Sequence, residues 1–275
     1  MSKAVSIIHG PFGRVVLYHI DRTLIAHAHR EGHLLFHVSG ANSRVRIKDK
    51  DHIVGPTTGV AVNPWEVHTY IPEVPAVGQY ALVLYIREPW FTGHRPGAYD
   101  ALNFGRREFR ITPEIALLVK HVVGKVLSGS EDETIEAMLY ELAEACRYSS
   151  HLHLPQPQPL ELRLGVNDFR VRKSIRLLSD CLDADIDMSQ VASEAGLSRP
   201  HFFKLFHSQV GLPPKLFWNT MRIERAFVDL VQSEKKIADI GFDLGFSSQS
   251  SFSRFFCLNT GMAPTDYRRV GHLVH

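Results

Sequence analysis

Cysteine is scarce in this chain of 275 residues, which has only Cys146, Cys181 and Cys257. Three widely spaced cysteines, an odd number, exclude a disulfide framework and a zinc site built from paired thiolates. Apolar runs of membrane-spanning length are also missing, and the N-terminus lacks the basic and apolar segments of a secretion signal. We therefore predict a cytoplasmic protein with no membrane partner.

Net charge is low as well. The chain has 31 Lys and Arg against 29 Asp and Glu, and from Leu164 onward the counts are 14 and 12. Charge is therefore a weak signal for nucleic acid, and DNA binding has to be argued from the helix pattern. Histidine is abundant by contrast, and 12 of the 16 histidines precede Leu164, so imidazole chemistry belongs to the first half.

The first 86 residues contain short β-branched and aromatic runs that are separated by Gly, Pro, Asn and Asp. These runs predict strands over residues 15–20, 24–25, 34–38, 44–47, 59–62 and 80–86. Many short strands at this spacing are typical of a small barrel or sandwich. The length of the chain allows two domains, and we predict that the first covers residues 1–110.

Two amphipathic helices are predicted over residues 111–148, with a break at residues 128–130. Thr112 and Pro113 form a helix start, and apolar residues then recur at helical spacing in both segments. The two apolar stripes fit packing on the chain's own barrel or a homodimer interface equally well. The alternating prolines that follow predict an extended linker over residues 149–163.

Residues 164–275 have the pattern of an all-helical domain in which residues 187–206 and 237–256 repeat one another. Each copy predicts a short amphipathic helix, a glycine turn and a second helix that opens on a serine. The copies align at Gly196-Leu197-Ser198 with Gly245-Phe246-Ser247, and at Phe202 and Phe206 with Phe252 and Phe256. A helix-turn-helix unit places its second helix in the DNA major groove. Two units predict recognition of a long, asymmetric site.

The second helix of each unit has an apolar face and an outward face. Helical spacing puts Phe202, Leu205 and Phe206 inside in the first copy, and Phe252, Phe255 and Phe256 inside in the second. On the outward faces, glutamine suits adenine, arginine suits guanine, and a phenylalanine can meet a thymine methyl group. The candidate DNA-binding residues are Arg199, Pro200, His201, Phe203, Lys204, Gln249, Ser250, Ser253 and Arg254. The alternative is that these residues are ordinary solvated side chains on a surface helix. Two copies of the pattern in the same register argue against it.

The stretch from about Phe169 to Arg269 resembles the AraC/XylS family of bacterial transcription regulators. The matching motif residues are Val191, Ala192, Gly196, Ser198, Phe206, Gly211, Pro213, Arg222, Ala226, Ile237, Ile240, Gly245, Phe246, Ser251, Phe252, Arg254, Phe256, Gly261, Pro264, Tyr267 and Arg268. The resemblance implies two helix-turn-helix subdomains joined by one long helix over residues 214–232. It also implies promoter DNA as partner, RNA polymerase if the protein is an activator, and an internal carboxylate partner for Arg222. Pro200 and Phe203 depart from the family pattern because both are poor hydrogen-bond donors.

Two histidine-containing segments of the first domain resemble the two cupin motifs. The first is His27-Ala28-His29, with His33 at the position of the usual acidic ligand and Gly40 in place. The second runs from Gly59 through Pro64 to His68. The resemblance implies one divalent transition metal, zinc, nickel, iron or copper, held by His27, His29, His33 and His68. Histidines that only form hydrogen bonds in an organic effector pocket are the alternative.

The predicted fold class is multidomain β + α: an N-terminal cupin-like β-barrel with a helical hairpin, and a C-terminal all-α tandem helix-turn-helix domain over residues 164–275. The predicted function is a sequence-specific DNA-binding transcription regulator, a homodimer and not an enzyme, controlled by a small-molecule or metal effector. A metal-dependent cupin enzyme tethered to a DNA-binding module is one alternative, although no nucleophile–base pair stands out. An oligomerisation domain without a ligand is another.

Overall fold

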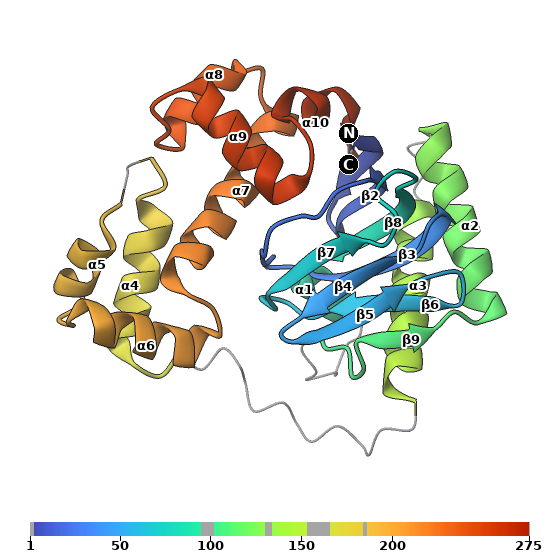
Figure 1. Cartoon of the computed structure of the whole chain (residues 1–275), viewed down its shortest axis with the longest axis horizontal. Helices are drawn as coiled ribbons and strands as arrows, with labels where there is room; N and C mark the ends of the chain where they lie inside the picture. Colours follow the sequence, from blue (N-terminus) through green and yellow to red (C-terminus); the bar gives the residue numbers. More distant parts are fainter. Residues whose placement is uncertain (1–2, 95–101, 130–133, 153–165, 184–185, 275) are drawn as a thin grey trace. The chain divides into compact units, whose positions relative to one another are not determined.

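The computed structural model describes residues 3–94, 102–129, 134–152, 166–183 and 186–274 (Figure 1). Its contacts separate two compact units: residues 1–159 together with 260–275, and residues 160–259. This differs from the predicted DNA-binding domain over residues 164–275, because residues 260–275 pack with the first unit. None of the described helices combines the length and the apolar character needed to cross a membrane.

The first unit contains two β-sheets, as the predicted β domain requires. The seven-stranded sheet has the order β10-β1-β2-β8-β3-β6-β9, and the three-stranded sheet has the order β5-β4-β7. The strands of the large sheet are β1 (Lys3–Gly10), β2 (Gly13–Ile20), β3 (Gly32–Gly40), β6 (Thr58–Val62), β8 (Gln79–Ile86), β9 (Glu108–Arg110) and β10 (Gly271–Leu273). The strands of the small sheet are β4 (Ser43–Ile47), β5 (Lys50–Val54) and β7 (His68–Pro72).

The predicted strand at residues 24–25 is wrong. These residues lie in an irregular segment, where the Leu24 N–H donates to the Tyr70 carbonyl at 3.1 Å. Two apolar residues between polar neighbours are too few for a strand of ordinary length. Conversely, β5 was not among the predicted strands. Its first three residues, Lys50, Asp51 and His52, are all polar and lack the apolar–polar alternation that predicts a strand.

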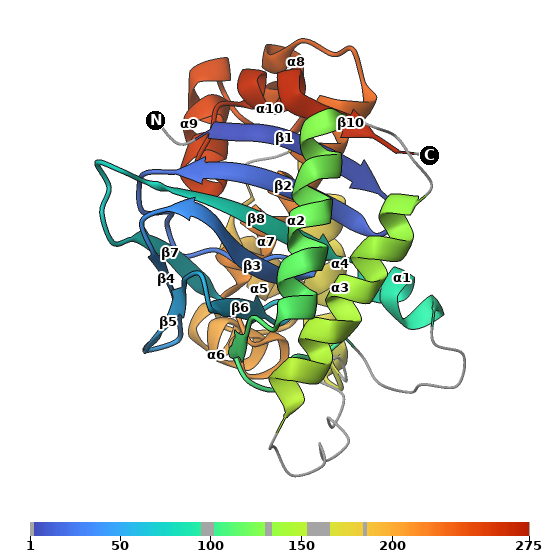
Figure 2. The same cartoon turned by 90° about the vertical axis from the view of Figure 1, so that its right-hand side faces the viewer.

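The predicted helical hairpin is present as α2 (Pro113–Ser128) and α3 (Thr134–His151), after a short helix α1 (Glu88–Gly93). The Thr112 hydroxyl accepts a hydrogen bond from the Ile115 N–H at 3.2 Å and so caps α2. Both apolar stripes belong to one buried cluster with residues of the large sheet, and the helices lie across that sheet (Figure 2). Packing within the chain therefore accounts for both stripes. Residues 149–151 of the predicted linker are helical, and residues 153–163 lie outside the described residues.

The second unit consists of helices, as predicted. They are α4 (Phe169–Asp180), α5 (Met188–Glu194), α6 (Arg199–Val210), α7 (Pro214–Gln232), α8 (Ile237–Asp243) and α9 (Gln249–Thr260). Aromatic rings fill its core: Phe206 meets Phe217 of α7 at 5.6 Å between ring centroids, and Phe256 meets Phe227 at 5.7 Å. The long helix α7 thus contributes to the core of both helix pairs. A further helix, α10 (Pro264–Val270), belongs to the first unit.

Candidate nucleic-acid interface and buried histidine cluster

The two helix-turn-helix units share one turn geometry. Gly196 and Gly245 have φ angles of 72° and 73°, a left-handed conformation that glycine adopts without a steric cost. In the first unit the Leu197 N–H donates to the Ala192 carbonyl at 2.9 Å, and in the second the Phe246 N–H donates to the Gly241 carbonyl at 2.9 Å. The sequence repeat is therefore a structural repeat with equivalent hydrogen bonds.

Helix α6 exposes most of the predicted DNA-binding residues of the first unit. Arg199, Pro200, His201 and Lys204 are exposed, whereas Phe203 is half-buried against the Phe202 ring at 5.6 Å. Pro200 lies in the first turn, where its missing N–H has no intrahelical partner to lose. Of the predicted core residues, Phe202 and Phe206 are fully buried. Leu205, also predicted inside, is half-buried because it lies at the edge of the apolar face.

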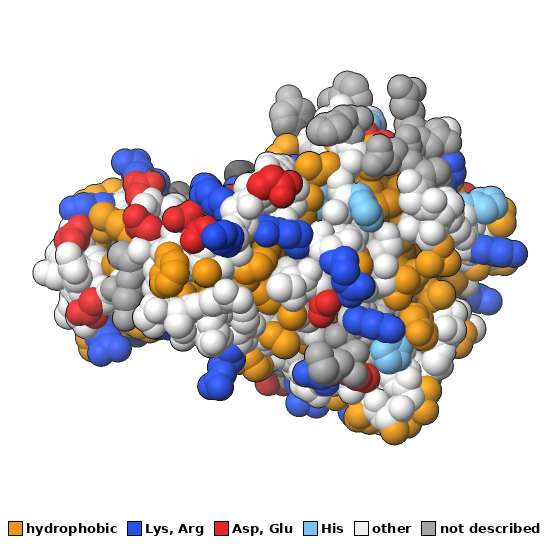
Figure 3. All heavy atoms as spheres, turned by 90° about the horizontal axis from the view of Figure 1, so that it is seen from above, with side chains coloured by type: hydrophobic (Ala, Val, Ile, Leu, Met, Phe, Trp, Pro, Cys, Tyr) orange, Lys and Arg blue, Asp and Glu red, His pale blue; other side chains and the backbone are white. Residues whose placement is uncertain are grey.

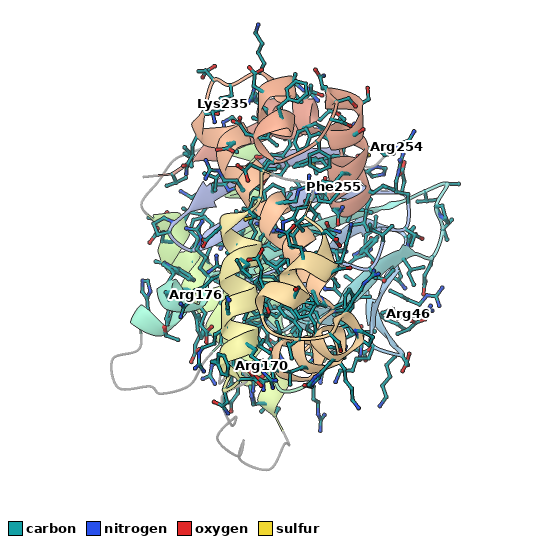
Figure 4. All side chains as sticks on the ribbon, turned by 90° about the vertical axis from the view of Figure 1, so that its left-hand side faces the viewer. Arg46, Arg170, Arg176, Lys235, Arg254 and Phe255 are labelled. Carbon is teal, nitrogen blue, oxygen red and sulfur yellow. The ribbon has the colours of Figure 1, made fainter. Side chains whose placement is uncertain are left out.

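Helix α9 likewise has an exposed polar face and a buried apolar face. Gln249, Ser250 and Arg254 are exposed and Ser253 is half-buried, while Phe252 and Phe256 are fully buried. Phe255, predicted inside, is half-buried, with its ring centroid 4.9 Å from that of Phe246. Figure 4 shows Arg254 on the outer side of α9 and Phe255 turned towards the interior of the unit.

Arg222 of α7 contacts other residues of the second unit. Its guanidinium donates to the backbone carbonyl of Leu244 and lies over the rings of Phe246, at 3.7 Å from the centroid, and Trp218, at 4.2 Å. These contacts tie α7 to the turn after α8. These contacts are to a carbonyl and to ring faces, and the internal carboxylate partner that the family resemblance implied stays a prediction.

Three of the four predicted metal ligands form one group in the first unit. His27, His29 and His68 each offer a ring nitrogen within 4.8 Å of the others. His33 lies beside them, with its ring centroid 4.6 Å from that of His68 and 5.3 Å from that of His29. All four side chains are buried. His27 and His29 precede β3, whereas His33 and His68 lie at the starts of β3 and β7, so the fold assembles the cluster from distant segments.

Backbone carbonyls orient two of these rings. The Nδ1 atom of His27 is 2.6 Å from the Ile25 carbonyl oxygen, and that of His68 is 2.9 Å from the Glu66 carbonyl oxygen. Because a carbonyl can only accept a hydrogen bond, Nδ1 carries the proton in both rings and the Nε2 lone pair remains available. A carbonyl behind the second nitrogen is the common support of a metal-binding histidine.

Burial keeps the cluster neutral. It lowers the pKa of His27, and it lowers the pKa values of His29, His33 and His68 well below the usual value for histidine. The neutral form is the one that ligates metals. Among the described residues, His29 Nε2 and His33 Nδ1 are buried without a hydrogen-bond partner. A buried polar atom without a partner costs about 1–3 kcal/mol, so the site favours a ligand that engages such atoms.

A buried ion pair that the sequence analysis missed adjoins the cluster. Arg14 of β2 donates to Glu31 Oε1 at 3.2 Å, and its guanidinium carbon lies 3.8 Å from the centroid of the Tyr85 ring. The Tyr85 ring in turn stacks on His33 at a centroid distance of 5.1 Å. Arg14 precedes the apolar run of residues 15–18, and nothing in the pattern marks it as buried.

A known protein family matches the part of the chain that contains the helix-turn-helix units. Residues 191–270 match the family described as "Helix-turn-helix domain", and this range begins within α5 and includes α6, α8 and α9. Fold and match together show that this part of the chain is a helix-turn-helix domain. Its motif residues resemble those of the AraC/XylS family.

Two relatives of this chain are named as transcriptional regulators. The chain is 34% identical over 103 residues to an uncharacterized HTH-type transcriptional regulator of Staphylococcus aureus, a match that covers 38% of this chain and only 14% of that protein. It is 22% identical to the protein named "Probable transcriptional regulator LumQ" of Photobacterium leiognathi, over 90% of this chain and 94% of LumQ. The crystal structure of unsaturated fatty acid bound ToxT from Vibrio cholerae has a TM-score of 0.57 at 15% identity, covering 93% of this chain and 94% of ToxT, and shows a shared fold.

Proposed function

We propose that the protein regulates transcription by binding promoter DNA through α6 and α9, under the control of an effector in the first unit. The observation that carries the proposal is the pair of equivalent glycine turns, each followed by a helix with an exposed polar face. The relatives named above are described as transcriptional regulators, which supports regulation over the enzyme alternative.

We assign base recognition to the exposed faces of α6 and α9. Gln249 is suited to adenine and Arg254 to guanine, since each can form two parallel hydrogen bonds in the major groove. Arg199 and Lys204 are suited to phosphates, which would fix the register of the protein on DNA. On the face shown in Figure 3, basic and acidic side chains are interspersed, without a broad patch of one charge.

The direct test is a genome-wide footprint of the purified protein on DNA from its own organism. We expect protection of asymmetric sites that lie within promoters and span two successive major grooves. Sites spread without regard to promoters, or protection of one groove only, would contradict the proposal.

For the effector we propose a divalent transition metal, zinc, nickel, iron or copper, held by His27, His29 and His68. Three neutral imidazoles, two of them supported by carbonyls, and an unpaired Nε2 atom on His29 fit such an ion. His33 is the nearest candidate for a fourth ligand. The ion would act as a Lewis acid that draws the histidine rings together. Residues packed against these rings would then transmit their displacement.

An organic effector is the second candidate, favoured by a separate pocket. A cavity of about 250 Å³ lies between β3 and α2. Its lining is mostly apolar, with two basic side chains: Phe36, His37, Val38, Pro56, Ile111, Ala116, Val119, Lys120 and Val123. Apolar walls beside Lys120 suit a carboxylate with a hydrocarbon tail, and the similar fold of ToxT holds an unsaturated fatty acid. Saturable binding of oleate that is weakened in Lys120→Gln would support this candidate, and no binding would exclude it.

We also propose that α2 forms a homodimer interface. Leu117 and Leu127 are 54% and 59% exposed, although the buried face of the same helix packs on its own sheet. Both leucines lie on the solvent side of α2, with Gly124 also exposed between them. Exposed leucines around a small residue favour close contact with a second copy of this helix.

A further inference from the structure

The last segment of the chain, α10 and β10, is built into the sheet of the first unit. β10 pairs in parallel with β1, from Ile7 opposite Gly271 to His9 opposite Leu273, and the Val274 N–H donates to the His9 carbonyl at 2.7 Å. The match to the helix-turn-helix family nevertheless extends to residue 270 and so includes α10. Helix α10 thus belongs to the matched helix-turn-helix family by its sequence and to the first unit by its contacts.

A hydrogen bond between Tyr267 and His9 anchors this segment. Tyr267 is fully buried, and its hydroxyl lies 2.9 Å from His9 Nε2. Burial, with help from the Arg14 and Arg87 charges, lowers the pKa of His9 to about 3, and burial raises the pKa of Tyr267. Both groups are therefore neutral at physiological pH, and the bond does not depend on ordinary changes in acidity.

A continuous row of cross-strand neighbours connects this anchor to the histidine cluster. His9 lies opposite Arg14, Arg14 opposite Tyr85, and Tyr85 opposite His33. Directly opposite residues share one face of a sheet and contact each other. Arg14 stacks on Tyr85, and the rings of His29 and His33 both lie 5.1 Å from that of Tyr85.

We propose that the row His33–Tyr85–Arg14–His9 couples occupancy of the histidine cluster to the attachment of α10 and β10 on β1. The proposal rests on the effector function assigned above. Because these side chains are closely packed, a ring that moves onto a metal displaces Tyr85, and with it Arg14 and the His9–Tyr267 contact. α10 follows α9 after residues 261–263, so the change reaches a DNA-reading helix along the chain.

Amide hydrogen exchange of residues 264–274 in the full-length protein tests the coupling, with and without zinc. We expect zinc to change the exchange rate of these amides. Tyr267→Phe keeps the ring but removes the hydroxyl, and should speed their exchange roughly two- to tenfold. Tyr80→Phe, at an exposed tyrosine of the same strand as Tyr85, is the matched control and should leave the rates unchanged.

Two further variants interrupt the row and leave the sequence of residues 264–274 unchanged. His33→Gln perturbs its far end and should alter the exchange of residues 264–274 even in the absence of metal. Arg14→Gln combined with Glu31→Gln removes both charges of the buried pair, so neither is left unpaired, and should abolish the response to zinc while zinc still binds.

Elemental analysis of the same samples separates the two proposals. If zinc binds but neither zinc nor His33→Gln changes the exchange of residues 264–274, the coupling is wrong and the metal site stands. If zinc does not bind, the metal proposal fails, and the response to His33→Gln alone decides the coupling. A zinc response that survives in the double variant would also overturn the coupling.

Discussion

His27 and His68 exchange both of their backbone hydrogen bonds, each 3.0 Å long, and their ring centroids lie 4.3 Å apart. This isolated antiparallel bridge joins an irregular segment to the first residue of β7. The backbone itself therefore sets the spacing of the two imidazoles. A site fixed in this way is preorganised, since little side-chain freedom remains to be lost when an ion binds.

The proposed metal site makes a prediction about stability. Zinc at about 100 times its Kd should raise the free energy of unfolding by about 2.7 kcal/mol, because the ion binds only the folded state. The increase should vanish in His68→Ala and persist in His19→Ala, whose ring lies outside the cluster beside Tyr80. Urea denaturation with zinc and with chelator measures it. An equal increase in all three proteins would refute a site at His68.

The protonation of His9 predicts a dependence of stability on pH. Its pKa is about 3 in the folded protein and 6.5 in the unfolded chain, so between these values the unfolded state binds one more proton. The free energy of unfolding should therefore fall as pH drops below 6.5, by about 1.4 kcal/mol per pH unit from this residue. Urea titrations in chelator at pH 7, 6 and 5 should show a slope that is shallower in His9→Gln. An unchanged slope would contradict the low pKa.

The proposed base recognition by Arg254 predicts a loss of affinity that depends on the DNA sequence. Arg254→Ala should weaken binding to the protected promoter site by about 1–3 kcal/mol, and should relax the preference for guanine at one position. Gel-shift titration at fixed salt, on the site and on single-base variants, measures both effects. Arg176→Ala, at an exposed arginine of α4, is the control (Figure 4). Equal losses on all sequences would reassign Arg254 to phosphate contact.

The positive φ angle of Gly196 predicts a conformational cost. No atom lies within 4 Å of a Cβ placed there, so only backbone strain opposes a side chain. Gly196→Ala should lower the free energy of unfolding by about 1–2 kcal/mol, and Gly196→Asn by less, because asparagine tolerates this conformation. Thermal unfolding of the two variants decides, and equal effects of Ala and Asn would contradict a strain origin.

The proposed dimer depends on the exposed face of α2. Leu117→Arg places a charge in the apolar contact and should raise the dimer dissociation constant at least about tenfold. Light scattering over a dilution series measures it. Val77→Arg, at a loop residue that is 57% exposed, should leave the association unchanged. A wild-type protein that is monomeric at all concentrations would exclude the interface.

Local patterns predicted most of the helical unit because its signals are short-range. The residue pairs that define a helix lie within four positions, and Gly196 and Gly245 mark their turns by a backbone requirement that glycine alone meets easily. The packing of the last helix, α10 (Pro264–Val270), could not be predicted in this way. Its partners in β1 are distant in sequence.

The β unit was less predictable. Strands are defined by their partners, so Leu24 and Ile25 suggested a strand that does not exist, while β5 was hidden by its polar residues. The histidines could be grouped by motif, but their shared location depends on the bridge between His27 and His68. Arg14 and Glu31 carried no sequence signal because their burial arises only when β2 pairs with β8.

The amino-acid sequence by itself determined the tandem helix-turn-helix domain, the polar faces of its second helices and the identity of the four clustered histidines. These features depend on local spacing and on residue chemistry. Only the tertiary structure decided which atoms of the histidines are free, that Arg14 links them to His9, and that the chain's last helix is held on the first strand. Those relationships join residues up to 258 positions apart, as between His9 and Tyr267. They arise only when β1 pairs with β2 and β10 in the folded sheet.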